Sequence, residues 1–443
     1  MVFSNLSRLN DELHIASVTG DMSQVNSLLE CQQLDINAHF GRLEETALME
    51  AAKKGHINVV EILLAHKQID VNKKQIAGVS AYMAAAERGH TDIMRLFRGH
   101  GGVDVYTEGG SALILAASNG QTDAAKLLLE DEQIDVTQTL NFTNHGHNGH
   151  TALTVASKNG HYDIVELLLE NENVDVNGRD GIDGGTALIH AAFNNQSNIV
   201  QLLLSQPDID INMGNNDGDT PLMKAYDCWQ CLDDYRQKTH ENNYEILKLL
   251  LGHHNIDVNK QNNEGATALM EYTHYKKIEM MRLLLRNNEV DVNAVDYGSG
   301  STALMHAIGA NHGPNVGLLI KHEKLDVNKQ NNNGWTALMQ AAFSGKHIGS
   351  VLSHDQVDVN IRNNEGRTAL FYAAKLHDQD NWDTGDTARK LEKAIKNAQL
   401  LLDHEDIEAT MECDEAIVEE VKDLLCQHVS SRRKKRDANK LDL

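Results

Sequence analysis

The chain has 443 residues, 41% of them hydrophobic, and a formal net charge of −24 at pH 7, which disfavours generic nucleic-acid binding by its body. No apolar run approaches the roughly 20 residues that cross a bilayer, and the N-terminus lacks the basic region and apolar stretch of a signal peptide. Five scattered cysteines are too few for a disulfide framework. We therefore expect a cytoplasmic protein without a membrane span.

One pattern recurs about ten times along the chain. A triplet of Thr or Ser, Ala or Pro, and Leu or Tyr returns at intervals between 31 residues (80 to 111) and 47 residues (220 to 267). It begins at Thr46, Ser80, Ser111, Thr151, Thr186, Thr220, Thr267, Thr302, Thr336 and Thr368. Residues 13–30, ahead of the first triplet, have the same two-helix pattern, so we count eleven units in all.

Each unit predicts two helices and a turn. In TALMEAAKKG (46–55) the small residues suit a short helix that packs closely on its neighbours, and Gly55 ends it with a positive φ. The same end is expected at Gly89, Gly120, Gly160 and Gly345. The next stretch, such as DIVELLLE (163–170), has too many apolar residues for one exposed stripe and predicts a buried helix. Asn, Asp and Gly in VDVNGRDGIDGG (174–185) then predict a hairpin-like turn.

The segment GHTALTVASKNGHYDIVELLLENENVDVN (149–177) closely resembles an ankyrin repeat, and the resemblance extends from about residue 10 to about residue 408. It implies an all-α repeat solenoid, a curved rod of about eleven ankyrin-type helix-turn-helix units with hairpin-like turns. Within it, His56, His90 and His161 fill a Gly-His position for which we expect a helix-capping role.

The repeat register predicts the organisation of the chain. An N-terminal capping repeat (1–37) precedes an array of about ten units (38–408) with insertions at 141–150, 227–243 and 376–399. The segment 409–428 has an apolar helical face and predicts a capping helix over the last repeat. A basic tail, 429–443, ends the chain.

The resemblance also implies a function. Ankyrin arrays are binding scaffolds whose protein partners dock on the turn tips and on the concave face of the first helices. The sequence contains no catalytic motif. We therefore expect a non-catalytic, monomeric scaffold. Trp335, Phe343 and Arg367 form the candidate hot spot in these variable positions, with Phe193 as a second contact. The alternative for these rings is that each leans on the next repeat. Alternative functions are a targeting adaptor that recruits a catalytic partner through its C-terminal helix, and an architectural spacer.

The family resemblance also implies a modification. An asparaginyl hydroxylase acts in this family on a pattern of Leu, five residues, Asp, an aliphatic residue and Asn. The pattern ends at Asn37, Asn72, Asn177, Asn212, Asn259, Asn293 and Asn360. The alternative is that these Asn residues only hold the turn backbone.

Three further clusters allow a ligand, although we predict no metal and no cofactor. His145, His147 and His150 lie in a Gly-rich insertion, for which a flexible surface loop is favoured over a cation site. A single Cys228/Cys231 pair is a weak zinc signal. The basic run Arg432, Arg433, Lys434, Lys435 and Arg436 is typical of a nuclear import signal, an anionic-surface contact or a solvated tail. A nuclear location is therefore the alternative to a cytoplasmic one.

Overall fold

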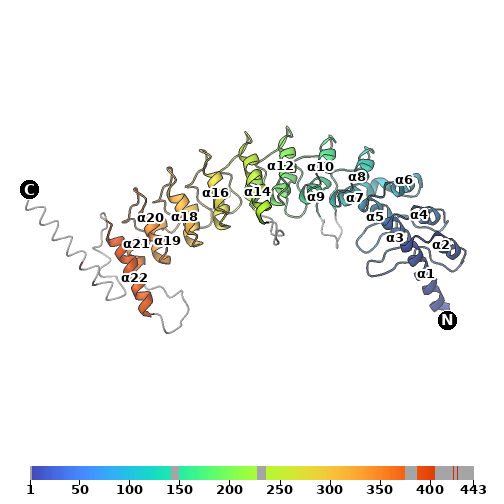
Figure 1. The fold of residues 1–443 in the computed structure, drawn as a ribbon, viewed down its shortest axis with the longest axis horizontal. Helices are drawn as coiled ribbons and strands as arrows, with labels where there is room; N and C mark the ends of the chain where they lie inside the picture. The colour runs from blue at the N-terminus through green and yellow to red at the C-terminus, as the bar shows by residue number, and fades with distance from the viewer. Residues whose placement is uncertain are drawn as a thin grey trace, which may run out of the picture. The chain divides into compact units, whose positions relative to one another are not determined.

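The computed structural model describes residues 2–140, 149–226, 236–374 and 387–404, together with residues 423 and 427. Across these ranges it has helices, 22 in number, and no strand (Figure 1). Three isolated antiparallel bridges lie at the turns, at Phe40–Glu45, Lys74–Ser80 and Val295–Thr302. The helices form eleven successive pairs, so the predicted all-α repeat fold is confirmed. None of the described helices is both long and apolar enough to cross a membrane.

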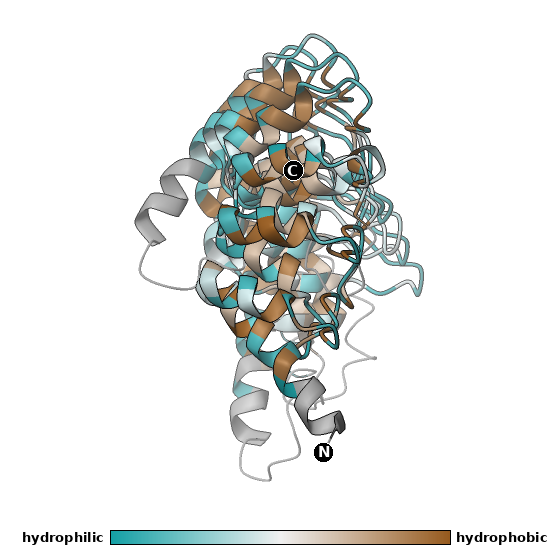
Figure 2. Cartoon of the chain, turned by 90° about the vertical axis from the view of Figure 1, so that its right-hand side faces the viewer, coloured by the Kyte–Doolittle hydropathy of each residue, from teal (hydrophilic) through white to brown (hydrophobic). Residues whose placement is uncertain are grey.

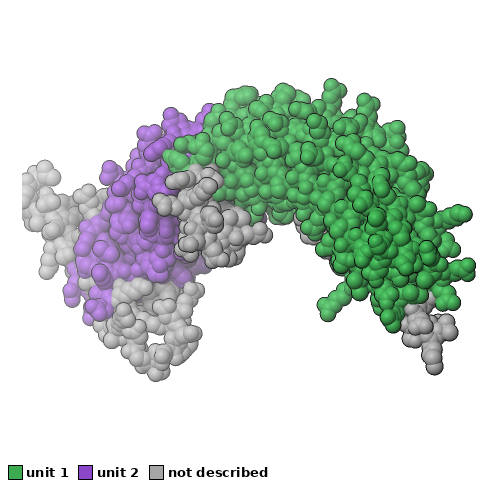
Figure 3. Space-filling model, turned by 45° about the vertical axis from the view of Figure 1, so that its right-hand side comes forward, with its two compact units in different colours: residues 1–256 green, residues 257–443 purple. Residues whose placement is uncertain are grey.

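The chain divides into two compact units, residues 1–256 and 257–443, which Figure 3 colours separately. In unit 1 the first helices of the pairs are α1 (Val2–Thr19), α3 (Ala47–Lys54), α5 (Ala81–Glu87), α7 (Val105–Ser118), α9 (Ala152–Asn159), α11 (Ala187–Phe193) and α13 (Pro221–Lys224). The second helices are α2 (Met22–Leu29), α4 (Ile57–Leu64), α6 (Thr91–Gly99), α8 (Thr122–Leu129), α10 (Tyr162–Leu169), α12 (Ser197–Leu204) and α14 (Arg236–Leu251).

Unit 2 repeats the same arrangement. Its first helices are α15 (Ala268–His274), α17 (Ala303–Gly309), α19 (Ala337–Ser344) and α21 (Ala369–Ala374). Its second helices are α16 (Ile278–Leu284), α18 (Gly313–Ile320), α20 (Ile348–Leu352) and α22 (Thr387–Leu402). Helices α14 and α22 have 16 residues each, twice the length of α10.

The core of each unit lies between neighbouring repeats. First helices pack on first helices, as α3 does on α5 and α5 on α7, and second helices pack on second helices, as α4 does on α6. Ala51 and Ala52 of α3 are fully buried, because a methyl side chain lets the helices approach closely. Leu63 of α4 is buried as well. Figure 2 shows apolar residues along the helices, whereas the turns are largely hydrophilic.

The repeated Thr starts the first helix of a pair. Thr186, for example, has an extended backbone (φ −86°, ψ 166°), and its side chain accepts a hydrogen bond from Ile189 N at 3.3 Å. This satisfies one of the free N–H groups of the first turn. The positive φ expected where the first helix ends is confirmed for all five glycines named above. The values are 81° for Gly55, 75° for Gly89, 70° for Gly120, 82° for Gly160 and 63° for Gly345.

One turn differs from the prediction. Between Asp104 and Ser111 the chain does not form a hairpin-like turn but continues as the first part of α7, which starts at Val105. Asp104 caps this helix by accepting a hydrogen bond from Thr107 N at 3.1 Å. The segment contains Gly109 and Gly110, yet Glu108 on it is buried against Ser80 and Lys74, which favours the helix. Ser111 therefore lies inside a helix rather than at its start.

The expected capping role of three histidines is also wrong. His56, His90 and His161 precede second helices, but none makes a side-chain cap hydrogen bond. Each Nε2 instead lies within hydrogen-bond distance of a carbonyl oxygen of the preceding repeat. The distances are 3.0 Å to Val18 O for His56, 3.2 Å to Lys53 O for His90 and 3.1 Å to Ser118 O for His161. These rings link neighbouring repeats.

Several sequence predictions fall outside the described residues. These are His145 and His147, Cys228 and Cys231, the basic run 432–436 and, apart from residues 423 and 427, the capping helix 409–428. The domain boundaries given above therefore stay predictions.

Candidate functional site

Two positions of the repeat determine how neighbouring first helices meet. We call the residue immediately before the Thr or Ser of a triplet the base residue, and the residue four positions after that Thr or Ser the facing residue. At two junctions the base residue of one repeat lies against the facing residue of the next. Ring centroids are 4.2 Å apart between Trp335 and Tyr372, and 5.0 Å apart between His150 and His190.

Trp335 and Phe343 belong to a cluster of three rings in unit 2, completed by Tyr372. Phe343 lies 5.5 Å from Trp335 and 6.2 Å from Tyr372 between centroids, edge to face in both cases. Tyr372 is buried, and its hydroxyl accepts a hydrogen bond from Asn363 Nδ2 at 2.7 Å, whereas Trp335 and Phe343 are half-buried. The structure thus brings two of the predicted binding residues together and gives Trp335 a packing contact with the next repeat.

Arg367 and Phe193 lie in other surroundings. Arg367 is the base residue of the last triplet, and its guanidinium lies 4.6 Å from the ring centre of Phe371. It also pairs with Glu365 at 2.6 Å. Phe193 is the last residue of α11 in unit 1 and is half-buried. Of the predicted hot spot, Trp335 and Phe343 form a ring pair and Arg367 lies over Phe371, whereas the second contact, Phe193, belongs to the other unit.

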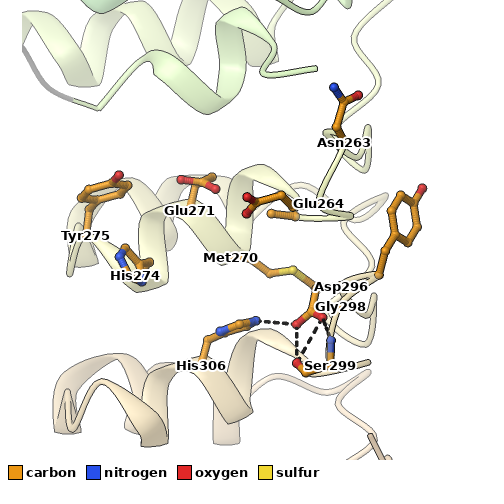
Figure 4. Close-up of a pocket in the computed structure, with 12 residues that line it drawn as sticks. Asn263, Glu264, Met270, Glu271, His274, Tyr275, Asp296, Gly298, Ser299 and His306 are labelled. Atoms are coloured by element: carbon orange, nitrogen blue, oxygen red, sulfur yellow. Dashed lines mark hydrogen bonds and ion pairs between the residues drawn. The ribbon is translucent and has the colours of Figure 1, made fainter. Parts of the chain in front are cut away.

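A groove of about 750 Å³ opens between the repeats of α15 and α17, which the sequence did not indicate (Figure 4). Its lining includes the carboxylates of Glu264, Glu271 and Asp296 and the rings of Tyr275 and Tyr297, the latter 64% exposed. Carboxylates beside exposed aromatic rings suit the ammonium and guanidinium groups of a basic ligand.

Asp296 is held in place at the edge of this groove. Its Oδ1 accepts hydrogen bonds from the backbone N–H groups of Ser299 (2.6 Å) and Gly300 (3.0 Å), and its Oδ2 pairs with His306 Nε2 at 2.9 Å. Burial raises the pKa of Asp296, but the bonds from Ser299 and the hydrogen bond and charge of His306 outweigh burial and lower it. The carboxylate therefore stays ionised.

In unit 1 the corresponding junction holds a buried cluster of His150, Asp180 and His190. Asp180 Oδ2 lies 3.0 Å from His150 Nδ1 and 2.7 Å from His190 Nε2. Among the described residues these three are the group whose ligand-type atoms converge, all within 4.8 Å of one another. His150 is 1% exposed, so its predicted place in a surface loop with His145 and His147 is wrong.

Asp180 is ionised although it is buried. Burial raises its pKa, but the hydrogen bond and charge of His190, the charge of His150 and the N–H of Ile182 more than offset this and hold the pKa far below its usual range. No sequence motif marks this cluster, because 30 residues separate positions 150 and 180. Alignment of base and facing residues across the repeats is the signal that finds it.

The repeated Asn residues bridge neighbouring turns. Asn177 donates from Nδ2 to Asp208 O at 2.7 Å and accepts at Oδ1 from Asp210 N at 2.8 Å. The Nδ2 bond to a carbonyl of the next turn recurs at 2.7 Å for Asn37, Asn72, Asn212, Asn259, Asn293 and Asn328. These contacts fit the reading in which Asn holds the turn backbone, and nothing in them tests hydroxylation.

Comparison with known proteins agrees with this geometry. A family model described as ankyrin repeats (3 copies) matches residues 13–107, 68–139, 83–180, 113–215, 172–233, 237–331 and 313–384. Among solved structures, the ankyrin repeat domain of Bcl-3, described as a unique member of the IkappaB protein family, is 24% identical in sequence with a TM-score of 0.43. That match covers 50% of this chain and 93% of the other.

Proposed function

Since the chain belongs to the ankyrin-repeat family, whose repeats are generally protein-interaction modules, we propose that it is a non-catalytic scaffold for protein partners. The partner contacts the turn tips and the surface of the first helices. In unit 2 the main anchor is the pair Trp335 and Phe343.

The observation that carries this proposal is the incomplete burial of two adjacent rings. Trp335 and Phe343 lie 5.5 Å apart and keep part of their surface exposed, although only 5% of the chain is aromatic. Aromatic residues dominate the binding energy of protein interfaces when a partner covers them fully. The contact of Trp335 with Tyr372 fixes the indole in one orientation, which lowers the entropy cost of binding.

The groove in the same unit supports a partner with basic residues. Glu264 and Glu271 line it beside Tyr275, and the net charge of −24 favours the approach of a cationic segment. A partner segment with an apolar residue and a Lys or Arg therefore fits this unit.

The two alternative functions differ in what supports them. A spacer requires an even polar face on the first helices, which Trp335 and Phe343 interrupt. An adaptor acting through the segment 409–428 relies on residues that the structure does not describe, apart from 423 and 427.

The proposal is tested by crosslinking the protein in source cells and identifying the captured proteins by mass spectrometry. Each candidate is then purified, and its binding to the intact chain is measured directly. We expect Trp335→Ala to weaken binding strongly. The matched control is Tyr106→Ala, which removes a 47% exposed ring from α7 in unit 1. Equal binding by wild type and Trp335→Ala for every candidate would overturn the assignment of the anchor.

A further inference from the structure

The cluster of His150, Asp180 and His190 is built from three separate elements of unit 1. His150 is the base residue ahead of α9, Asp180 lies in the turn before α11, and His190 is the facing residue within α11. All three are buried, with exposures of 1%, 6% and 8%. Stacking of two repeats therefore brings two imidazoles and one carboxylate to a common point.

We propose that this cluster binds one Zn²⁺ ion through His150 Nδ1, Asp180 Oδ2 and His190 Nε2. Two imidazole nitrogens and one carboxylate oxygen form a donor set that Zn²⁺ prefers, with ligand bonds of about 2.0–2.2 Å. Ligand atoms that share a tetrahedral ion at that distance lie roughly 3.3 Å apart. The distances of 3.0 and 2.7 Å from Asp180 Oδ2 to the two nitrogens are hydrogen-bond lengths slightly below this spacing, and all three atoms lie within 4.8 Å of one another, so small shifts of the two rings bring them to the ligand spacing.

The other oxygen of Asp180 has its own partners. Oδ1 accepts hydrogen bonds from the backbone N–H groups of Ile182 at 3.2 Å, Asp183 at 3.3 Å and Gly185 at 3.1 Å. These bonds orient the carboxylate so that Oδ2 faces both imidazoles, as partners outside the ligand shell do in metal sites. A Cβ on Gly185 would lie 2.8 Å from His190 Nε2, so a glycine leaves the ring room to approach.

Without a metal the same residues form a hydrogen-bonded chain. Lys158 Nζ lies 3.3 Å from His150 Nε2, so the ammonium donates to that nitrogen and Nδ1 carries the proton that faces Asp180. Zn²⁺ binding at Nδ1 requires this proton to move to Nε2, so the imidazole stays neutral and binds the metal through the Nδ1 lone pair. Nε2 then carries the N–H and no longer accepts from Lys158, which must turn away. Its side chain is half-buried and long enough to do so.

A second junction supplies an internal comparison. Asp296 and His306 in unit 2 occupy the same repeat positions as Asp180 and His190 and pair at 2.9 Å. The base residue there is Ala266 instead of His150. This junction has the ion pair without the third ligand, so it does not hold Zn²⁺ in the same way.

The test is equilibrium dialysis of the metal-free full chain against Zn²⁺ alone, in a Cys228→Ser, Cys231→Ser background. His150→Asn and His190→Gln each keep an amide donor toward Asp180 but remove the imidazole. We expect one bound Zn²⁺ per chain in the parent and affinities at least about tenfold weaker in both variants. The controls Asp296→Asn and the pair His145→Gln, His147→Gln should bind as the parent does. A parent that binds no Zn²⁺, or cluster variants that bind it equally well, would overturn the proposal.

A spectroscopic measurement on the parent keeps the test independent of variant folding. Co²⁺ alone, bound in place of Zn²⁺, should give the intense visible absorption of a tetrahedral site without thiolate charge transfer. Weak octahedral absorption would contradict the assigned ligands.

Discussion

The indole of Trp335 lies over the phenol ring of Tyr372 in the following repeat, with the ring centroids 4.2 Å apart. His150 and His190 occupy the same two repeat positions, 5.0 Å apart. The repeat thus brings one base residue and one facing residue together at these two junctions, one in each unit. The identity of these two side chains decides whether a junction is aromatic, ionic or able to bind a metal.

Two neighbouring carboxyl groups of one repeat, Glu45 and Glu50, lead to a prediction about pH. Burial, together with the hydrogen bond and charge of the neighbouring Glu45, raises the pKa of Glu50 to about 7 from its usual 4.5, and Lys53 and Lys54 oppose this only partly. The folded state therefore holds more protons than the unfolded state between about pH 4.5 and pH 7. The contribution of Glu50 to the free energy of unfolding should fall as pH rises through this window, whereas His14, whose pKa burial lowers, contributes in the opposite sense.

Urea unfolding monitored at pH 5 and pH 7.5 checks this expectation. The glutamine of Glu50→Gln stays neutral at both pH values. This variant should therefore lack most of the decrease in the free energy of unfolding that the wild type shows between pH 5 and pH 7.5. The pKa of Glu45 is lowered, so its contribution is lost only below about pH 4.5, outside this window. An equal pH dependence in wild type and Glu50→Gln would show that Glu50 is not the responsible group.

The Asn bridges predict a loss of stability on substitution. Asn177→Ala removes both hydrogen bonds to the next turn, one to Asp208 O and one from Asp210 N. We expect the free energy of unfolding to drop by about 1–3 kcal/mol, because two backbone groups lose their partners. Asn173→Ala, at an exposed position of the same turn, is the control and should change it by less than about 0.5 kcal/mol. Similar losses for both variants would mean that the bridge contributes nothing.

Hydroxylation of the same residues is a separate prediction. It adds one oxygen, roughly 16 Da, to peptides that contain Asn177, Asn212, Asn259, Asn293 or Asn360. Because Asn177 Nδ2 and Oδ1 are both hydrogen-bonded, we expect modification only where the turn opens locally. Mass spectra of protein from its native source check this, and unmodified peptides throughout would leave only the structural role.

Because α7 replaces a turn ahead of Ser111, we expect position 110 to tolerate only glycine. A Cβ on Gly110 in α7 would lie 2.6 Å from Asp135 O, a backbone atom that cannot move aside freely. Gly110→Ala should lower the free energy of unfolding by about 1–3 kcal/mol. Gly99→Ala, also in a helix but with nothing within 4 Å, should be neutral or slightly stabilising. A thermal melt of the two variants compares them, and a harmless Gly110→Ala would contradict the packing described for α7.

The repeat fold could be predicted from the sequence because the same triplet and the same helix-ending Gly recur in successive units. Thr at the helix start and Gly at its end act locally, so each unit predicts its own two helices. The start of α7 could not be predicted, because Gly109 and Gly110 indicate a turn whereas the burial of Glu108 favours the helix. The cluster of His150, Asp180 and His190 was missed because its members meet only when two repeats stack. The variable positions of Trp335 and Phe343 could be compared across repeats, and the structure places the two rings side by side, whereas their binding role stays a prediction.

Arg367 supplies a prediction about the edge of the proposed binding surface. Its guanidinium contacts Phe371 and pairs with Glu365, so it is already oriented. Arg367→Ala should cost about 2 kcal/mol or more of partner affinity, whereas Glu365→Gln, which removes only the paired charge, should cost less. Calorimetric titration with the identified partner measures the affinity of both variants. A larger loss of affinity for Glu365→Gln than for Arg367→Ala would show that Glu365, and not Arg367, contacts the partner.

Whether a partner covers Trp335 is decided by one variant measured in two ways. Trp335→Ala should lower thermal stability, because the ring packs on Tyr372, and should also weaken the purified partner's binding to the folded chain by about 2 kcal/mol or more. Titration at a temperature where circular dichroism shows the variant fully folded separates the two effects. A loss of stability with unchanged affinity would contradict the account and leave Trp335 as a packing residue between repeats.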